Sequence, residues 1–590
     1  MCGIIGYVGD KSSAVDYVIN GLEKLEYRGY DSAGIGYVFN NNVVIKKNQG
    51  RVKNLKSLLE EDIKSNIAIG HTRWATHGEA NELNSHPHKV GNITIVHNGI
   101  IENFQSIKSE MTELKFLSDT DTEVGAALLN QLYKKEKNML NAIKEFQSIV
   151  KGSYAIAAIV DDDLDTIYAI KNASPLLIGV GISENFIASD MPSILEYADK
   201  YVELNDGDFA SISKNEISVF NNMGEEKKYV IKNFKGRQTT LDKNGYDHYM
   251  LKEIHEQPEI VKEMVKTYLE DKNNFLNLKL YNKIKIVACG SAMHAGLVGK
   301  CLIEKYAHKE VDVEIASEFR YKENFLNKKD LVIFISQSGE TADTLACVKK
   351  VNNLGVDTLG IINVEESSIA RETKYVLYTK AGNEIAVATT KAYMAQTLLL
   401  AILALKMSDN LIEKELAAIL KTIPNEMEKV LSDTNYKEIA KKIHKKNDIY
   451  FIGRGIDYAL CLEGSLKLKE ISYLHSEAYA AGELKHGTIS LIEENTPVIS
   501  IITDKYIAEK TISNIKEVKT RGAYVILIIS SDIEVSKDIY DEIIVIPEIN
   551  KIFQFLLTIV PLQLIAYETA KLNKCDIDKP KNLAKSVTVE

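Results

Sequence analysis

The sequence is poor in cysteine, tryptophan and proline, and it contains no long hydrophobic run. Its 590 residues include only 6 cysteines, 9 prolines and 1 tryptophan. The cysteines are too sparse for a disulfide framework, and none of them has the spacing of zinc ligands. The sequence therefore predicts a protein of a reducing compartment, the cytoplasm, without a structural zinc site.

A basic surface for nucleic acid is lacking as well. The formal net charge is −10, and lysine and arginine are dispersed rather than gathered in a tail or stripe. The two most apolar runs, 394–407 and 553–567, are shorter than the ~20 residues that a bilayer-spanning helix needs, and Pro561 interrupts the second. The first residues do not have the pattern of a signal peptide. We expect two buried core helices, and neither nucleic acid nor a membrane as partner.

Two different patterns divide the chain. Up to about residue 235, short strand patterns are interrupted by few helical stretches, notably 12–25 and 122–135, which predicts an α+β domain of stacked sheets. Beyond about residue 281, near-continuous Val/Ile strands alternate with longer helical segments, as in doubly wound parallel sheets. The polar stretch 233–247 lacks periodicity and is expected to be a linker.

The second part contains an internal repeat. IKIVACGSAMHAG (284–296) and IYFIGRGIDYAL (449–460) both have the pattern of a strand, a glycine turn and the start of a helix. Each is followed by a second buried strand, in 331–341 and 497–507. We interpret them as two copies of one α/β module. Only the first copy keeps a hydroxyl-rich turn after its second strand, so we expect the ligand site mainly there.

The first ten residues, MCGIIGYVGD, place a cysteine directly after the initiator methionine. If Met1 is removed, Cys2 carries both a thiol and a free α-amino group, which together form a nucleophile with its own base. The alternative is that position 2 tolerates any small residue. These ten residues alone do not decide between the two.

The hydroxyl-rich turn is SQSGET, at 336–341, between a buried strand and a helix. A helix N-terminus offers unpaired N–H groups and a partial positive charge, and the hydroxyls add donors, so the turn is suited to a phosphate. Ser291, after the neighbouring strand, could join it. An ordinary Ser/Thr helix cap is the alternative. A P-loop and a GxGxxG motif are both absent, which argues against a nucleotide.

Glu463, Lys467 and Glu470 are spaced to share one face of a helix. A surface ladder of ion pairs would explain this spacing equally well. The following stretch, HSEAYAAGELKHG at 475–487, combines small residues with histidines and charges, as in a loop close to a ligand. Carboxylate, lysine and histidine are the groups that moving a proton between adjacent sugar carbons requires.

A set of further motifs accompanies these features in a fixed order. In the first half they are CGIIGY, LEYRGYDSAG, GHTRWATHG, HNGIIEN and DTDTEV, and in the second EIASEFRY, SQSGETADT, TTKAY, LKLKEISY, EAYAAGELKHG and NLAKSVTVE. Across essentially its whole length, the sequence resembles the isomerising glutamine–fructose-6-phosphate aminotransferases, the glucosamine-6-phosphate synthase family.

The resemblance implies a fold and a reaction. The fold is an α+β N-terminal-nucleophile (αββα) glutaminase domain followed by two α/β doubly wound sugar-isomerase (SIS) domains. The implied boundaries are 2–235 for the glutaminase, 236–280 for a linker and leading helix, 281–422 and 440–580 for the SIS domains, and 581–590 for a tail closing the sugar site. Glutamine would supply ammonia through an internal channel to fructose 6-phosphate, giving glucosamine 6-phosphate, with no metal and no organic cofactor.

The resemblance also assigns roles in the glutaminase half. Cys2 would attack the glutamine carboxamide, and the Asn98 side chain and the Gly99 N–H would stabilise the oxyanion. Arg28 would support the nucleophile. The implied glutamine-binding residues are Arg73, Thr76, His77 and Asp121. Trp74 is the implied gate of the ammonia channel.

In the sugar half, Lys585 would form a Schiff base with the open ketose, Glu470 would shuttle the proton between carbons 1 and 2, and His486 from a neighbouring subunit would open the ring. Such a shared site requires at least a homodimer. Lys467 and Glu463 would support this chemistry.

The phosphate site departs from the family pattern at two positions. The family usually has threonine where this chain has Ser291, and often serine where it has Ala292, so one of the two hydroxyls remains. The implied phosphosugar-binding residues are Ser291, Ser336, Gln337, Ser338, Thr341 and Glu463.

Two other functions compete with this one. A different class II amidotransferase could send ammonia to another acceptor, although an SGGxDS-type pyrophosphatase motif and a ribose-pyrophosphate loop are both missing. A phosphosugar-sensing SIS protein would bind the sugar without turning it over. The absence of a basic helix-turn-helix segment, the presence of Glu470 and Lys585, and the whole glutaminase half argue against that function.

Overall fold

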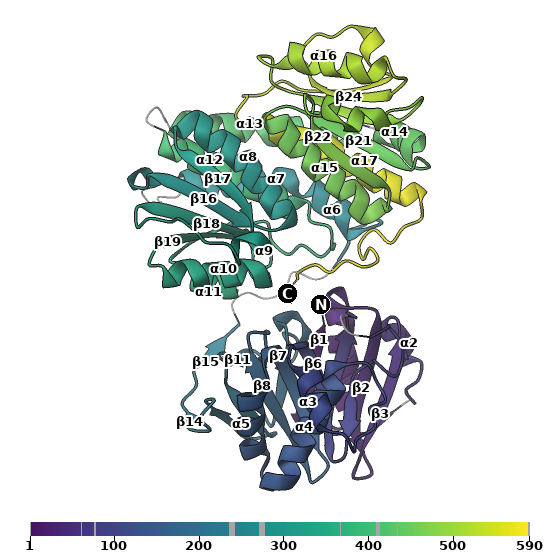
Figure 1. The fold of residues 1–590 in the computed structure, drawn as a ribbon, viewed down its shortest axis with the longest axis vertical. Helices are drawn as coiled ribbons and strands as arrows, with labels where there is room; N and C mark the ends of the chain where they lie inside the picture. Colours follow the sequence, from purple (N-terminus) through teal and green to yellow (C-terminus); the bar gives the residue numbers. More distant parts are fainter. Residues whose placement is uncertain are drawn as a thin grey trace. The chain divides into compact units, whose positions relative to one another are not determined.

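The computed structural model describes residues 2–60, 62–75, 78–234, 242–270, 278–365, 367–408, 413–433 and 435–587 (Figure 1). The chain divides into two compact units, the first comprising residues up to 240 together with 586–590, the second residues 241–585. The predicted linker lies partly outside the described residues, since 235–241 are not among them.

The first unit is built on two antiparallel sheets. The first has the order β15 (Ile231–Asn233), β11 (Lys200–Glu203), β9 (Leu177–Val180), β10 (Glu184–Ala188), β1 (Gly3–Gly9), β4 (Ile67–Arg73), β2 (Ser32–Phe39), β3 (Asn42–Gln49). The second has the order β14 (Glu226–Lys227), β13 (Ile217–Phe220), β12 (Phe209–Ile212), β8 (Asp163–Asn172), β7 (Gly152–Val160), β6 (Ile93–Ile101), β5 (His88–Val90). The helices are α1 (Ala14–Leu25), α2 (Val52–Lys56), α3 (Phe104–Glu110), α4 (Asp121–Glu136) and α5 (Met139–Ile149).

Alternation along the strands produces four layers. Ile4 of β1 packs in the core between the sheets, whereas its neighbour Ile5 packs under α1, because successive side chains point to opposite faces of a strand. Residues of β6 such as Ile93 face α4 and α5 in the same way. The resulting α–β–β–α arrangement confirms the predicted fold class of the first half.

The second unit contains two parallel sheets. They have the orders β17 (Glu310–Ile315), β16 (Lys283–Ala288), β18 (Asp330–Ser336), β19 (Asp357–Ile362), β20 (Tyr375–Tyr378), and β22 (His475–Ala480), β21 (Asp448–Gly453), β23 (Pro497–Ile502), β24 (Tyr524–Ser530), β25 (Glu542–Ile546). In both sheets the first strand in the chain lies between the second and the third. This shared order confirms the internal repeat and the doubly wound fold.

Helices cover both sheets of the second unit (Figure 1). They are α6 (Tyr249–His255), α7 (Gln257–Val265), α8 (Gly290–Ala307), α9 (Ala316–Phe319), α10 (Ala342–Asn353), α11 (Ser368–Glu372), α12 (Lys391–Met407), α13 (Glu413–Leu431), α14 (Asn435–Ile443), α15 (Ile456–Ser472), α16 (Ala508–Lys519) and α17 (Gln554–Leu572). One core cluster runs through both modules and includes residues of α8, α12, α15 and α17.

The two apolar runs form α12 and α17. Among the described residues, α17 is the one helix with the length and apolarity to cross a membrane, and 83% of its most apolar window is buried inside the protein. The side chains of α12 are buried on all sides. A helix that is apolar all round belongs in a protein core or a membrane, and here both helices lie in the core. The prediction of two buried core helices is confirmed.

Candidate active sites

Strand pairing positions the predicted nucleophile. β1 runs antiparallel to β4, with Gly3 opposite Thr72, so Cys2 lies beside the end of β4. The Trp74 N–H donates to Cys2 Sγ at 3.3 Å, and the thiol faces the Trp74 carbonyl at 3.5 Å. Burial raises the pKa of the Cys2 thiol, although nearby positive charges, including Arg73 and Arg28, oppose the effect. The thiol therefore needs a base before it can attack.

Asn98 presents its amide nitrogen to the same residue. Its Nδ2 donates to the Cys2 carbonyl at 3.1 Å, and its Oδ1 lies 3.1 Å from His71 Nε2. His71 Nε2 also lies 2.9 Å from the His97 carbonyl. Since both neighbours of Nε2 are acceptors, Nε2 carries the proton. Burial lowers the pKa of His71 to about 3, so the ring stays neutral and holds the Asn98 amide in one orientation.

Gly99 follows Asn98 with a backbone that other residues rarely adopt. Its φ is +116°, and a Cβ at this position would lie 1.9 Å from the Ser153 carbonyl oxygen on β7. A side chain would clash with a backbone that is fixed in the sheet, so only glycine fits.

Arg73 lies within electrostatic reach of both the nucleophile and Asp121. The Arg73 guanidinium donates to the carbonyls of Gly78 and Glu79, each at 3.1 Å. Burial lowers the pKa of Arg73, and the charges of Cys2, Asp31 and Asp121 raise it. These three side chains therefore lie within electrostatic reach of the guanidinium.

Asp121 occupies the first turn of α4, and its Oδ2 accepts a hydrogen bond from the Ile101 N–H at 2.8 Å. Two predicted glutamine-binding residues, Thr76 and His77, lie outside the described residues. Arg28 donates from Nε to the Cys2 carbonyl at 3.2 Å and pairs with Asp190 at 2.7 Å. The half-buried Trp74 contacts Tyr30 edge to face, with 6.1 Å between the ring centroids.

The hydroxyl-rich turn lies between β18 and α10. Ser336 Oγ accepts from the Gly339 N–H at 3.0 Å and lies 3.2 Å from Thr341 Oγ1. Gln337 and Ser338 are half-buried beside them. Thr341 is the N-cap residue of α10 but makes no side-chain capping bond, so the turn is not an ordinary capping hydroxyl.

Glu463, Lys467 and Glu470 share one face of α15, as their spacing predicts. Lys467 Nζ lies 3.4 Å from Glu463 Oε1 and also pairs with Glu470. The side chains of Glu463 and Lys467 are each 1% exposed, so the alternative of a surface ladder is wrong. Burial raises the pKa of Glu470, which Lys467 and Lys585 partly counteract. Glu470 and Lys585 therefore belong to one cluster of charges.

Glu463 connects the two SIS modules. Its Oε1 accepts from Ser291 Oγ at 2.9 Å, and its Oε2 lies 2.8 Å from His294 Nδ1, both on α8. Ser291 is thus hydrogen-bonded to the second module. It also follows β16, the strand that pairs with β18. The adjacent Ala292 offers no hydroxyl.

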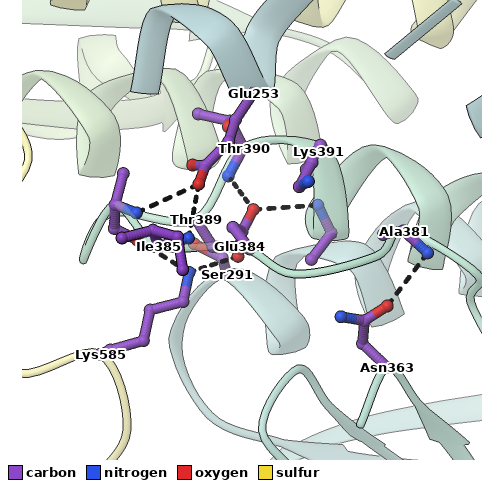
Figure 2. Close-up of polar contacts among 12 residues, drawn as sticks. Glu253, Ser291, Asn363, Ala381, Glu384, Ile385, Thr389, Thr390, Lys391 and Lys585 are labelled. Carbon is purple, nitrogen blue, oxygen red and sulfur yellow. Dashed lines mark hydrogen bonds and ion pairs between the residues drawn. The ribbon is translucent and has the colours of Figure 1, made fainter. Parts of the chain in front are cut away.

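Lys585 is anchored in a buried carboxylate cluster, shown in Figure 2. Its Nζ donates to Glu384 and, at 2.8 Å, to the Ala386 carbonyl. The Lys585 side chain is 6% exposed and that of Glu384 is fully buried. The preceding tail is held by Asp578, which accepts from the backbone N–H groups of Tyr249 and Met250 at 2.9 Å each.

His486 lies on an exposed turn. It ends the short 3-10 turn Leu484–His486 after β22 and is exposed in the single chain. The described residues bring together Lys585, Glu470, Lys467, Glu463 and Ser291, and among them no hydrogen bond or ion pair joins the His486 side chain to this cluster.

Sequence patterns missed several polar residues of these sites. They are His71 and Asp31 in the first unit and His294 and Glu384 in the second. Glu384 and Lys585 are 201 positions apart, so no local spacing relates them. A histidine on a buried strand, such as His71 on β4, is the one signal that could have been followed.

Family models match most of the chain. The glutamine amidotransferase domain matches residues 71–196, and the SIS domain matches 278–406 and 442–572. The glutamine–fructose-6-phosphate aminotransferase [isomerizing] of Clostridium tetani is 48% identical over 100% of both chains, and that of Bacillus subtilis is 42% identical over the same shares. This chain belongs to the isomerising glutamine–fructose-6-phosphate aminotransferases.

A solved structure of a relative matches more than half of this chain. The C-terminal domain of the glucosamine-fructose-6-phosphate aminotransferase from Francisella tularensis is 38% identical, with a TM-score of 0.55, and the match covers 57% of this chain and 99% of that one. The charged cluster around Lys585 thus lies in a unit whose fold is shared with an aminotransferase of the same family.

Proposed function

We propose that this protein transfers the amide nitrogen of L-glutamine to D-fructose 6-phosphate and isomerises the product, giving D-glucosamine 6-phosphate and L-glutamate. The observation that carries the proposal is that one chain holds two chemically different sites. Cys2 lies against the Asn98 amide in the first unit, and Lys585 and Glu470 share a buried cluster in the second. Full-length relatives with the aminotransferase name agree with this assignment.

The first half-reaction uses Cys2 as nucleophile. After removal of Met1, its α-amino group, with a typical pKa of ~7.7–8.0, accepts the thiol proton, and the sulfur attacks the glutamine carboxamide. The Asn98 side chain and the Gly99 N–H stabilise the oxyanion, where one such donor is typically worth ~100- to 1,000-fold in rate. Arg73 binds the α-carboxylate and Asp121 the α-ammonium of glutamine, and Thr76 and His77 complete the pocket.

The second half-reaction uses the sugar site. The phosphate binds at the turn of Ser336, Gln337, Ser338 and Thr341, with Ser291 from the adjacent helix. Lys585 forms a Schiff base with carbon 2 of the open ketose, and Glu470 moves the proton between carbons 1 and 2. Lys467 and Glu463 hold Glu470 in place through the ion pairs along α15.

Three finer features complete the proposal. His486 opens the sugar ring from a neighbouring subunit, so the working protein is at least a homodimer. Trp74 gates an internal ammonia channel. The protein acts in the cytoplasm, without nucleic acid or membrane partners.

The decisive experiment follows the labelled amide nitrogen. Glutamine labelled with ¹⁵N at the amide is incubated with fructose 6-phosphate, and we expect equal amounts of ¹⁵N-glucosamine 6-phosphate and glutamate. Binding of the sugar without turnover would favour a phosphosugar sensor, and ¹⁵N in another acceptor would favour a different amidotransferase.

The Cys2→Ala variant separates the two halves of the proposal. We expect it to lose glutamine-dependent synthesis and to keep isomerisation of fructose 6-phosphate, because Glu470 and Lys585 are untouched. Equal loss of both activities in a folded variant would contradict two separate sites.

A further inference from the structure

Glu384 is the group in closest contact with the Lys585 amine. Its Oε2 accepts from Lys585 Nζ and also from Thr389 Oγ1, the latter at 2.6 Å. Its Oε1 accepts from the backbone N–H groups of Thr390 and Ala392, at 2.9 and 3.1 Å, which fixes the carboxylate at the start of α12. Figure 2 shows Glu384 between Lys585 and the loop of residues 385–390 that precedes α12. One oxygen thus anchors the residue, and the other faces the amine.

A second buried carboxyl lies on the other side of this loop without contacting the amine. Glu253 of α6 accepts from the backbone N–H groups of Ile385 and Ala386, and its Oε2 has no hydrogen-bond partner among the described residues. Burial, with the charge of Glu384, raises the pKa of Glu253 to about 8, so it is largely protonated at neutral pH.

Glu384 has the opposite protonation state. Burial alone would raise the pKa of Glu384, but the Lys585 ammonium and the hydrogen bonds from Lys585, Thr389 and Thr390 hold it well below its usual range. The resting site therefore contains one ion pair beside one neutral acid.

An ammonium ion has no lone pair and does not attack a carbonyl. Lys585 is paired with a buried carboxylate and its side chain is only 6% exposed, so bulk water has little access to its proton. The base for Schiff-base formation must therefore be a group that already touches Nζ, and among the described residues the side chain that does so is Glu384.

We propose that Glu384 is the catalytic acid and base of Schiff-base formation at Lys585, a role that rests on the proposed function. Glu384 takes a proton from Nζ, and the freed lone pair attacks carbon 2 of the ketose while the carbonyl electron pair moves to oxygen. Glu384 returns this proton to that oxygen and then removes a second proton from nitrogen. It finally protonates the hydroxyl, which leaves as water as the nitrogen lone pair forms the C=N bond. Lysine ammonium and ketone thus become iminium and water, and Glu384 ends as the carboxylate.

The test traps the iminium in the full-length protein. Wild type and variants are incubated with fructose 6-phosphate and borohydride, and the sugar-phosphate adduct on Lys585 is measured by mass spectrometry. We expect Glu384→Gln to label at least ~100-fold more slowly, since acid–base catalysis is typically worth that much. Its affinity for fructose 6-phosphate and its hydrolysis of glutamine are expected to stay within about threefold of wild type, because the amide oxygen still accepts from Thr390 and Ala392.

Glu253→Gln is the matched control. It makes the same change of carboxyl to amide in the same cluster, at a residue that is already largely neutral and contacts only the backbone. We expect it to label within about threefold of wild type. Labelling of Glu384→Gln at the wild-type rate would overturn the proposal, and so would a loss of sugar binding as large as its loss of labelling, which would indicate a purely structural role.

Two further variants keep the test decisive. Lys585→Arg should show no adduct. An adduct in that variant would contradict the Schiff-base residue of the proposed function rather than the role of Glu384. If Glu384→Gln does not fold, Thr389→Val removes one hydrogen bond from the same oxygen and should change the labelling rate at least about threefold. An unchanged rate in that variant would overturn the proposal.

Discussion

At the residue scale, an uncharged histidine fixes the amide that faces the nucleophile. His71→Ala removes the N–H that holds Asn98 Oδ1, so the Asn98 amide is free to turn away from Cys2. We expect kcat for glutamine hydrolysis to fall ten- to hundredfold, below the ~100- to 1,000-fold typical of losing an oxyanion donor outright, with KM changed by less than about threefold. Steady-state glutaminase kinetics measure both constants.

Two further variants control this prediction. His71→Gln keeps an N–H donor at nearly the same reach, so its kcat should lie between those of wild type and His71→Ala. His475→Ala removes an exposed histidine that pairs with Asp448, and it should leave glutamine hydrolysis unchanged. A change in KM alone in His71→Ala would contradict the orienting role.

At the element scale, the turn between β18 and α10 depends on one glycine. Gly339 has a φ of +66°, and a Cβ there would lie 1.9 Å from Ser367 Oγ and 2.5 Å from Ser367 Cβ. Gly339→Ala should therefore displace the hydroxyl-rich turn and raise KM for fructose 6-phosphate at least about tenfold, the equivalent of ~1.4 kcal/mol. Glutamine hydrolysis in the first unit should not change.

Gly355→Ala separates backbone strain from the steric clash. Gly355 follows α10 with a nearly equal φ of +68°, but a Cβ there would meet nothing within 4 Å. It should cost about 1 kcal/mol of stability for the left-handed backbone and leave KM for the sugar unchanged. Equal KM values in the two variants would show that the turn does not bind the substrate.

The first unit also contains buried histidines on and beside its strands, which should make this unit sensitive to acid. Burial lowers the pKa of His71 to about 3, and that of His86 and His88 well below its usual value. The unfolded chain takes up protons below pH 6.5 and the folded one does not. Stability is therefore fully present above pH 6.5 and is lost as the pH falls from there towards 3.

Between pH 7 and 5 the lowered pKa of His71 should cost about 2 kcal/mol of unfolding free energy. Urea unfolding followed by the fluorescence of Trp74, the one tryptophan in the sequence, reports on the first unit. His71→Gln should reduce the loss of unfolding free energy between pH 7 and 5 by about the amount that His71 contributes. A loss that is the same in both proteins would contradict the prediction.

The elements themselves were largely predictable from the sequence, because burial imposes simple periodicities. The short strand patterns of the first half and the continuous Val/Ile runs of the second predicted strands such as β1 and β18, and the internal repeat predicted the doubly wound fold. The contacts of Glu384 and His71 were not predictable, since each depends on a partner far along the chain or on another strand. The ladder of Glu463 and Lys467 was ambiguous for a related reason, because helical spacing gives the shared face but not whether that face is buried.

At the scale of the whole molecule, the exposure of His486 is what a site completed by a second subunit requires. Glu470 lies in the cluster around Lys585, whereas His486 is exposed on the turn after β22. If His486 acts in a neighbouring subunit, a dimer that pairs one His486→Asn chain with one Glu470→Gln chain contains one intact sugar site and one site with both defects.

Mixing the two inactive variants therefore tests the shared site. Random reassociation of equal amounts makes half of the dimers mixed, each with one of two sites intact, so we expect recovery of about a quarter of wild-type synthesis. Each variant alone should stay inactive, and sedimentation should show that all samples have the same oligomeric state. If His486 instead serves the sugar site of its own chain, both sites of every mixed dimer carry one defect, and mixing restores nothing.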